Sequence, residues 1–177
     1  MALRFQTPPE KAVRSITAAL DALRSVPVPG FGVEAAAAGL LYPHVIYHLG
    51  LDDLAAGKGL EAAVPVSWGH IVGPLVVEVK YDTQEVSQIN QGPYGVGIAN
   101  SIARADGQAG DYEVSVLRIP GIYVIALWLK GNSDVIVPVP PVPQQFEAER
   151  FYPAPEFTAI ARRLAETRLA FDNAPVR

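Results

Sequence analysis

Three β-like runs in close succession constrain the fold of this chain more than any other feature. They cover residues 112–119, 122–130 and 134–139. Pro120-Gly121 separates the first two runs, and Gly131-Asn132-Ser133 separates the second two. Runs that are rich in β-branched and aromatic residues and bounded by turn residues are typical of strands. We therefore expect an antiparallel meander over residues 111–139.

The meander passes into a proline-rich strap at residues 138–143, in which proline alternates with valine. Two overlapping Pro-x-x-Pro spacings form the pattern that aromatic grooves recognise. The alternative is intramolecular: an extended segment covers the sheet, because proline has no N–H group that needs a partner. We favour the intramolecular strap and keep Pro138, Pro140 and Pro141 as candidate binding residues.

Amphipathic helices are predicted near both ends of the sequence. Thr7-Pro8-Pro9-Glu10 combines a capping residue, a proline suited to the first helical position and a capping-box glutamate. The helix that follows should end near Ser25, and its apolar positions recur at helical spacing. Residues 156–171 form the second predicted helix, with an apolar side of four residues: Phe157, Ile160, Leu164 and Leu169.

The order of the remaining elements favours an α+β fold. Strands are expected at residues 44–49, 64–72 and 75–81, and a helix at 96–105. Residues 85–90 are polar and are assigned to neither a strand nor a helix. Repeated βαβ units are missing, which argues against a doubly wound sheet. We expect a single domain, 1–177, with a mostly antiparallel sheet of five to six strands and the N- and C-terminal helices packed on one face.

The composition predicts apolar surface beyond what a core needs. Half of the residues are hydrophobic and 18% are charged, which is below the usual quarter of charged residues. Surplus apolar surface indicates an oligomer, a protein partner or a ligand groove. The run 122–130 is apolar on both faces, so it should be covered from both sides. A partner subunit is one source of that cover.

Several classes of function are excluded or disfavoured. The absence of cysteine excludes disulfides, thiolate metal sites and cysteine catalysis. The net charge of −4 with scattered basic residues argues against nucleic acid as a partner. No apolar run approaches the roughly 20 residues of a membrane span, and residues 1–6 lack a secretory pattern, so we expect a cytoplasmic protein. The excess of arginine over lysine and the abundance of alanine favour a bacterial source.

Cofactors and metals are not expected. Residues 92–97 are rich in glycine but do not match a nucleotide-binding pattern, and no lysine follows to reach a phosphate. His44 and His48 could begin a metal site, but a third ligand at a suitable spacing is missing. The glycine-rich segment is more typical of a turn, and the two histidines are more typical of ordinary strand residues.

One catalytic constellation is conceivable. His70 follows Trp68-Gly69, and Glu78 and Asp82 lie on or just after the next predicted strand. A histidine polarised by a carboxylate can act as a general base. No nucleophile in a strained turn accompanies it, and the alternative is a hydrogen-bonded histidine beside a core tryptophan.

The leading hypothesis is a non-enzymatic bacterial interaction or assembly protein that buries apolar surface in a homo- or hetero-oligomer. One alternative is a small-molecule enzyme, such as a hydrolase, centred on His70, Glu78 and Asp82. A second alternative is a module that binds an apolar ligand in a cupped sheet. The candidate binding residues are four aromatic residues and the three strap prolines: Trp68, Tyr94, Tyr123, Trp128, Pro138, Pro140 and Pro141.

Overall fold

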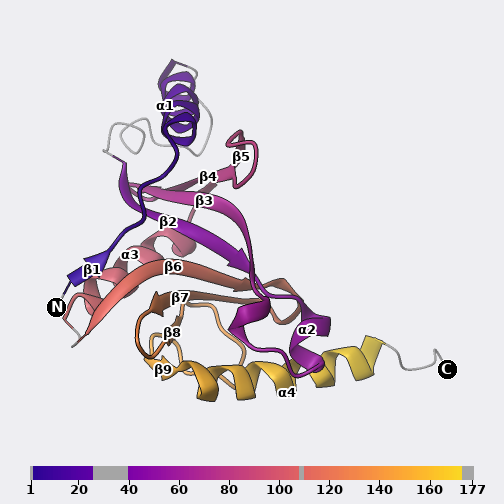
Figure 1. The fold of residues 1–177 in the computed structure, drawn as a ribbon. Coiled ribbons are helices and arrows are strands. Elements are labelled where there is room, and N and C mark those ends of the chain that lie inside the picture. Colours follow the sequence, from indigo (N-terminus) through magenta and orange to yellow (C-terminus); the bar gives the residue numbers. More distant parts are fainter. Residues whose placement is uncertain (1, 26–39, 108–109, 173–177) are drawn as a thin grey trace.

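The computed structural model describes residues 2–25, 40–107 and 110–172, and within them one mixed sheet dominates (Figure 1). The sheet has nine strands in the order β5-β4-β3-β2-β6-β7-β8-β9, with β1 also paired to β6. The strands are β1 (Ala2–Arg4), β2 (Leu41–His48), β3 (Val64–Val72), β4 (Leu75–Lys80), β5 (Val86–Gln91), β6 (Asp111–Ile119), β7 (Val124–Lys130), β8 (Val135–Pro138) and β9 (Tyr152–Pro153). The α+β class is confirmed, but the expected five to six strands were too few.

Helices surround this sheet. The α-helices are α1 (Glu10–Ser25), α2 (Leu51–Ala55), α3 (Pro93–Ala105) and α4 (Ala154–Asp172), and the 3-10 turns are η2 (Leu60–Ala62) and η3 (Pro120–Ile122). In Figure 1, α1 lies beside the β4–β5 end of the sheet, and α4 runs beside β8 and β9 toward the C-terminus. None of these helices, taken over the described residues, is long and apolar enough to cross a membrane.

The sheet combines an antiparallel meander with parallel pairings to β6. Strands β6, β7 and β8 pair antiparallel in sequence, as their short turns require. Strands β1 and β2 both pair parallel with β6, β1 at Asp111 to Glu113 and β2 at Ser115 to Arg118. Because β7 occupies the other edge of β6, β1 and β2 lie end to end along the same edge.

Two buried clusters cover opposite faces of the meander. On β6, Val114 and Val116 pack in a cluster with Ile98 and Ile102 of α3. The alternate residues Leu117 and Ile119 pack in a cluster with α4, through Phe157, Ala161 and Ala165. Strand β7 divides in the same way, with Leu127 and Leu129 in the first cluster and Ala126 and Trp128 in the second. The chain therefore covers both faces of β7 by itself, and no partner is needed there.

A third cluster lies under α1. Ala12, Ile16 and Leu20 of this helix pack against residues of β2, β3 and β4, which are Val45, Trp68, Val72, Leu75, Val77 and Val79. The spacing of the three helical residues places them on one face of α1. This packing explains why the N-terminal helix forms where its amphipathic pattern predicts.

Two local features differ from the sequence-based expectation. Residues 86–91, which lie in a polar stretch that was assigned to no element, form the edge strand β5 and pair antiparallel with β4. The helix expected at 96–105 begins three residues earlier, because α3 starts at Pro93 with Gly92 at its N-cap. Proline suits the first helical position, where its missing N–H group has no intrahelical acceptor.

Candidate functional site

A buried ion pair joins strands that are not neighbours. Arg118 of β6 donates from Nη1 to Oε2 of Glu78 at 3.0 Å and from Nη2 to Oε1 at 2.5 Å. Ser67 Oγ also donates to Oε2 of Glu78, at 3.3 Å. Strands β3 and β2 separate β4 from β6, a span of about 14 Å in a flat sheet. The two long side chains therefore reach toward each other across β2 and β3, on one face of a sheet that is visibly curved in Figure 1.

Tyr94, in the first turn of α3, lies against the same guanidinium. The Arg118 Cζ atom is 5.0 Å from the centroid of the Tyr94 ring, a cation–π distance. The Tyr94 hydroxyl and the guanidinium of Arg118 interact with each other, but the buried hydroxyl and the buried Nε make no hydrogen bond of full geometry within the part of the chain that the structure describes. Burial raises the pKa of Tyr94 to about 12, although the charge of Arg118 opposes that rise.

His44 is a second buried polar group on this side of the sheet. It is fully buried, and its Nδ1 lies 2.7 Å from the carbonyl oxygen of Tyr42. That contact assigns the proton to Nδ1. Desolvation lowers the pKa of His44 to about 4, the Tyr42 carbonyl opposes this, and Arg118 adds to it. His44 is therefore neutral near pH 7, and it contributes no charge to the site.

The three residues of the proposed acid–base constellation are not brought together. In the β3–β4 pairing His70 is opposite Val77, and Glu78 is opposite Gly69. Because successive residues of a strand point to opposite faces, His70 and Glu78 lie on different faces of the sheet. Asp82 is exposed in the turn after β4, where its Oδ1 accepts from the Thr83 N–H at 2.7 Å.

A pocket of about 350 Å³ opens beside the ion pair. Arg118 and Tyr94 form part of its wall, with Gln88 and Asn90 of β5 at one side. Tyr123 and the strap form the rest, together with Ile125 and Val139. The Pro140–Pro141 peptide bond, which is cis, also lies in this wall. Four of the candidate binding residues thus converge here: Tyr94, Tyr123, Pro140 and Pro141.

An apolar groove of about 620 Å³ adjoins this pocket and shares Tyr123 and Pro141 with it. It runs between the strap and the last turns of α4. We call it the strap–α4 groove, and it is lined by Gly121, Ile122, Tyr123, Pro141, Val142, Pro143, Leu164, Thr167, Arg168 and Phe171. Tyr123 and Phe171 are the most exposed large hydrophobic residues described, at 76% and 75%.

The other candidate binding residues lie apart from both cavities. Trp68 is buried under α1 and stacks on Tyr81 at 5.9 Å between ring centroids. Trp128 is buried in the α4 cluster and donates from Nε1 to Asp134 Oδ2 at 2.9 Å. Pro138 is buried on β8 opposite Ala126. These three contribute to the core.

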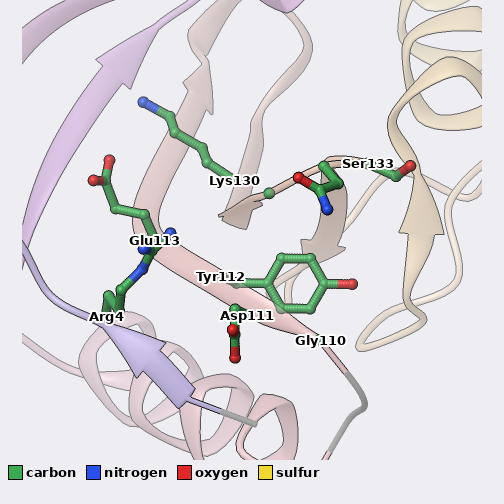
Figure 2. A pocket seen from close by; sticks show the side chains of 9 residues that line it. Arg4, Gly110, Asp111, Tyr112, Glu113, Lys130 and Ser133 are labelled. Carbon is green, nitrogen blue, oxygen red and sulfur yellow. The ribbon is translucent and has the colours of Figure 1, made fainter.

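A further hollow, of about 790 Å³, is polar and lies where β6 begins (Figure 2). Glu113 there accepts from Gln6 Nε2 at 2.5 Å. Figure 2 shows the Lys130 ammonium pointing away from Tyr112, and it lies 3.6 Å from the ring centroid of Tyr47. Among the described residues that line this hollow, none has a buried donor without a partner, in contrast to the pocket beside the Glu78–Arg118 ion pair.

Sequence reasoning missed Arg118 and Phe171. Arg118 stands between the apolar residues Leu117 and Ile119 in the buried half of β6, and a charge in a buried strand needs a partner. That signal was available, although it does not identify Glu78 as the partner. Phe171 was placed at the end of the last predicted helix, but it was named neither on the apolar side of that helix nor among the candidate binding residues.

The described residues contain no group of three or more histidine, aspartate or glutamate residues that could hold a metal ion. No protein-family model, curated protein or solved structure matches this chain. Any function must therefore be inferred from the geometry.

Proposed function

We propose that this chain is a non-enzymatic assembly protein that forms a homodimer through the strap–α4 groove. The observation that carries the proposal is the exposure of Tyr123 and Phe171 on one apolar groove. Large aromatic residues exposed together on an apolar surface mark association sites more often than ordinary surface.

The spacing of residues on α4 identifies a helix as the occupant. Four residues of α4 recur at intervals of four, three and four: Ile160, Leu164, Thr167 and Phe171. The last three line the groove, and Ile160 lines a second hollow, of about 440 Å³, that shares Leu164 and Thr167 with the groove. This is the spacing by which two helices pack along a common seam. Thr167 is compatible with that seam, because its hydroxyl already donates to the Arg163 carbonyl oxygen.

A second copy of the chain fits this surface better than an unrelated protein. A two-fold axis brings identical patches together, so one patch must supply both a projection and a recess. Phe171 projects at the end of α4, and the wall between Val142 and Leu164 provides the recess. Arg163, Glu166 and Arg168 flank the seam with both signs of charge, as a polar rim does.

Sedimentation equilibrium over a concentration series tests this proposal. We expect the wild-type chain to approach twice its mass of 18.9 kDa. Phe171→Ser removes a central aromatic contact and should raise the dimer Kd about thirtyfold. The matched control is Val64→Ser, since Val64 is also exposed and apolar but lies outside the groove. Equal Kd values for the two variants, or a wild-type monomer throughout, would contradict the proposal.

The volume of the groove favours one other function, the binding of an apolar ligand. At about 620 Å³ it lies within the range of small-molecule sites. A monomeric wild-type chain that binds an apolar fluorescent probe, and loses this binding in Phe171→Ser, would favour this alternative. The acid–base alternative gains no support, because His70 and Glu78 lie on opposite faces.

A further inference from the structure

We propose that the Arg118 pocket binds a small monocarboxylate with an apolar body. This inference goes beyond the proposed dimer and rests on other residues, apart from the shared Tyr123 and Pro141. We refer to the pocket of about 350 Å³ between β5, the first turn of α3 and the strap as the Arg118 pocket.

Arg118 retains donors that Glu78 does not use. A guanidinium has five N–H donors in a rigid fork, and the Glu78 carboxylate accepts hydrogen bonds from Nη1 and Nη2 only. The Nε–H group is buried and has no partner among the described residues. The edge formed by Nε and its neighbouring Nη is a geometry that binds carboxylates through two hydrogen bonds.

Tyr94 and the start of α3 add donors at the same place. The Tyr94 hydroxyl is buried without a hydrogen-bond partner in the described chain, and the residue lines the pocket. The first N–H groups of a helix have no intrahelical acceptors. In α3 the N-cap is Gly92, which makes no side-chain cap, and Gly92 also lines the pocket. The Tyr94 hydroxyl and the first N–H groups of α3 therefore place two kinds of donor at the same wall of the pocket.

The charge balance selects one carboxylate over a dianion. Arg118 is the only charged residue among the described residues that line the pocket, and Glu78 already pairs with it. His44 and His48 lie behind it, and burial lowers the pKa of both. A ligand with two negative charges would face Glu78 without a second cation.

The opposite wall requires an apolar body. Ile125, Val139, Tyr123 and Pro140 supply it. The volume lies near the lower end for small-molecule sites, which suits an aromatic ring on a short chain. Gln88 and Asn90 at the side can bind a polar substituent, because each amide both donates and accepts.

Titration with 3-phenylpropionate, followed by the amide signals of the nitrogen-15-labelled full chain, tests the proposal. We expect saturable shifts at Gly95 and Val96, with a Kd of about 1 mM or tighter, as for a small fragment. The uncharged analogue 3-phenylpropanol should bind at least about tenfold more weakly than 3-phenylpropionate, because its hydroxyl cannot accept the charge-assisted hydrogen bonds that a carboxylate accepts.

Two variants separate this site from the dimer interface. Tyr94→Phe keeps the ring and removes the hydroxyl, so 3-phenylpropionate should bind about tenfold more weakly. Phe171→Ser should bind it as the wild type does, because Phe171 does not line this pocket. If the chain proves to be a monomer, Phe171→Ser should still bind 3-phenylpropionate as the wild type does. The dimer proposal and the carboxylate proposal can therefore fail independently.

Four outcomes would overturn the inference. The first is the absence of shifts at Gly95 and Val96 with 3-phenylpropionate. The second is equal affinity for 3-phenylpropanol in the wild-type chain, a comparison that holds even if Tyr94→Phe does not fold. The third is tighter binding of the phenylphosphonate dianion than of 3-phenylpropionate. Shifts confined to residues 164–171 would show binding in the strap–α4 groove instead, and would also overturn it.

Discussion

Arg118 on β6 holds Glu78 on β4 across the two strands, β2 and β3, that lie between them. The side chains are 15% and 3% exposed, so each charge depends on the other for its partner. The pair therefore links the curvature of the sheet to the pocket beside it, because the same guanidinium lines that pocket.

Removing one partner of this pair should be costly. Glu78→Gln leaves Arg118 buried without a counter-charge, and we expect the free energy of unfolding to fall by about 3 kcal/mol. The double variant Glu78→Leu/Arg118→Leu should lose less than the single variant, since neither charge remains. Urea denaturation of both variants measures this. A single variant within about 0.5 kcal/mol of wild type, the usual range for surface sites, would show that the pair is not desolvated.

Stability should fall as the pH falls below 6.5. Burial lowers the pKa values of His44 and His70 from 6.5 to about 4, so the unfolded chain binds more protons between these limits. The stabilisation due to the neutral histidines is complete above pH 6.5 and is lost as the pH approaches 4. Each histidine should remove at most about 1.4 kcal/mol per pH unit.

Urea midpoints measured across that pH range check the expectation. His44→Asn retains a donor for the Tyr42 carbonyl oxygen and cannot become charged, so its pH dependence should be shallower than that of the wild type. If the urea midpoints of His44→Asn and of His70→Asn depend on pH as steeply as that of the wild type, groups other than these two histidines cause the loss of stability.

Gly69 is required by the close approach of His44. A Cβ atom at Gly69 would lie 2.4 Å from His44 Nε2, and His44 is fully buried and cannot move into solvent. Gly69→Ala should therefore lower the free energy of unfolding by about 1–3 kcal/mol. The control is Gly107→Ala, where the nearest atom lies at 3.4 Å. Combining Gly69→Ala with His44→Ala should cost less than the sum of the two single changes.

Tyr123 should be dispensable for folding and needed for binding. Its φ of 56° lies in the left-handed region, which disfavours a bulky residue, and 76% of it is exposed. Tyr123→Gly should leave the free energy of unfolding unchanged or raise it by up to about 1 kcal/mol. The same variant should weaken both dimerisation and 3-phenylpropionate binding.

Gln84→Gly provides the control for Tyr123→Gly, because Gln84 also has a positive φ, of 55°, and lines neither cavity. It should match the wild type in both binding assays. Strain of this kind often accompanies functional positions. If Tyr123→Gly destabilises the fold and both binding activities persist, Tyr123 serves folding rather than binding, which would contradict this prediction.

The sequence predicts the local elements well and the long-range ones poorly. Strand β3 was expected at the residues where it occurs, since its flanking turn residues define it. Strand β5 was missed because it is polar and exposed, and its backbone pairing with β4 carries no side-chain signal. The three-residue β1 depends on pairing with β6, more than one hundred residues away in sequence.

The candidate sites depended on register and curvature. The pairing of His70 with Val77 separates it from Glu78, and a shift of one residue would have reversed that outcome. Tyr94, Tyr123 and Pro140 were selected as aromatic or strap residues, but only the curved sheet brings them together. No sequence spacing encodes the contact between Glu78 and Arg118.

Hydrogen exchange of the backbone amides above and below the dimer Kd tests the central claim most directly. We predict that dimerisation slows exchange at residues 121–123, at Val142 and in the last turns of α4, whose residues Leu164, Thr167, Arg168 and Phe171 line the strap–α4 groove. Exchange along the exposed edge strand β5 should not change. Protection gained along β5 would indicate edge-to-edge pairing, and unchanged exchange in the groove at all concentrations would contradict the account.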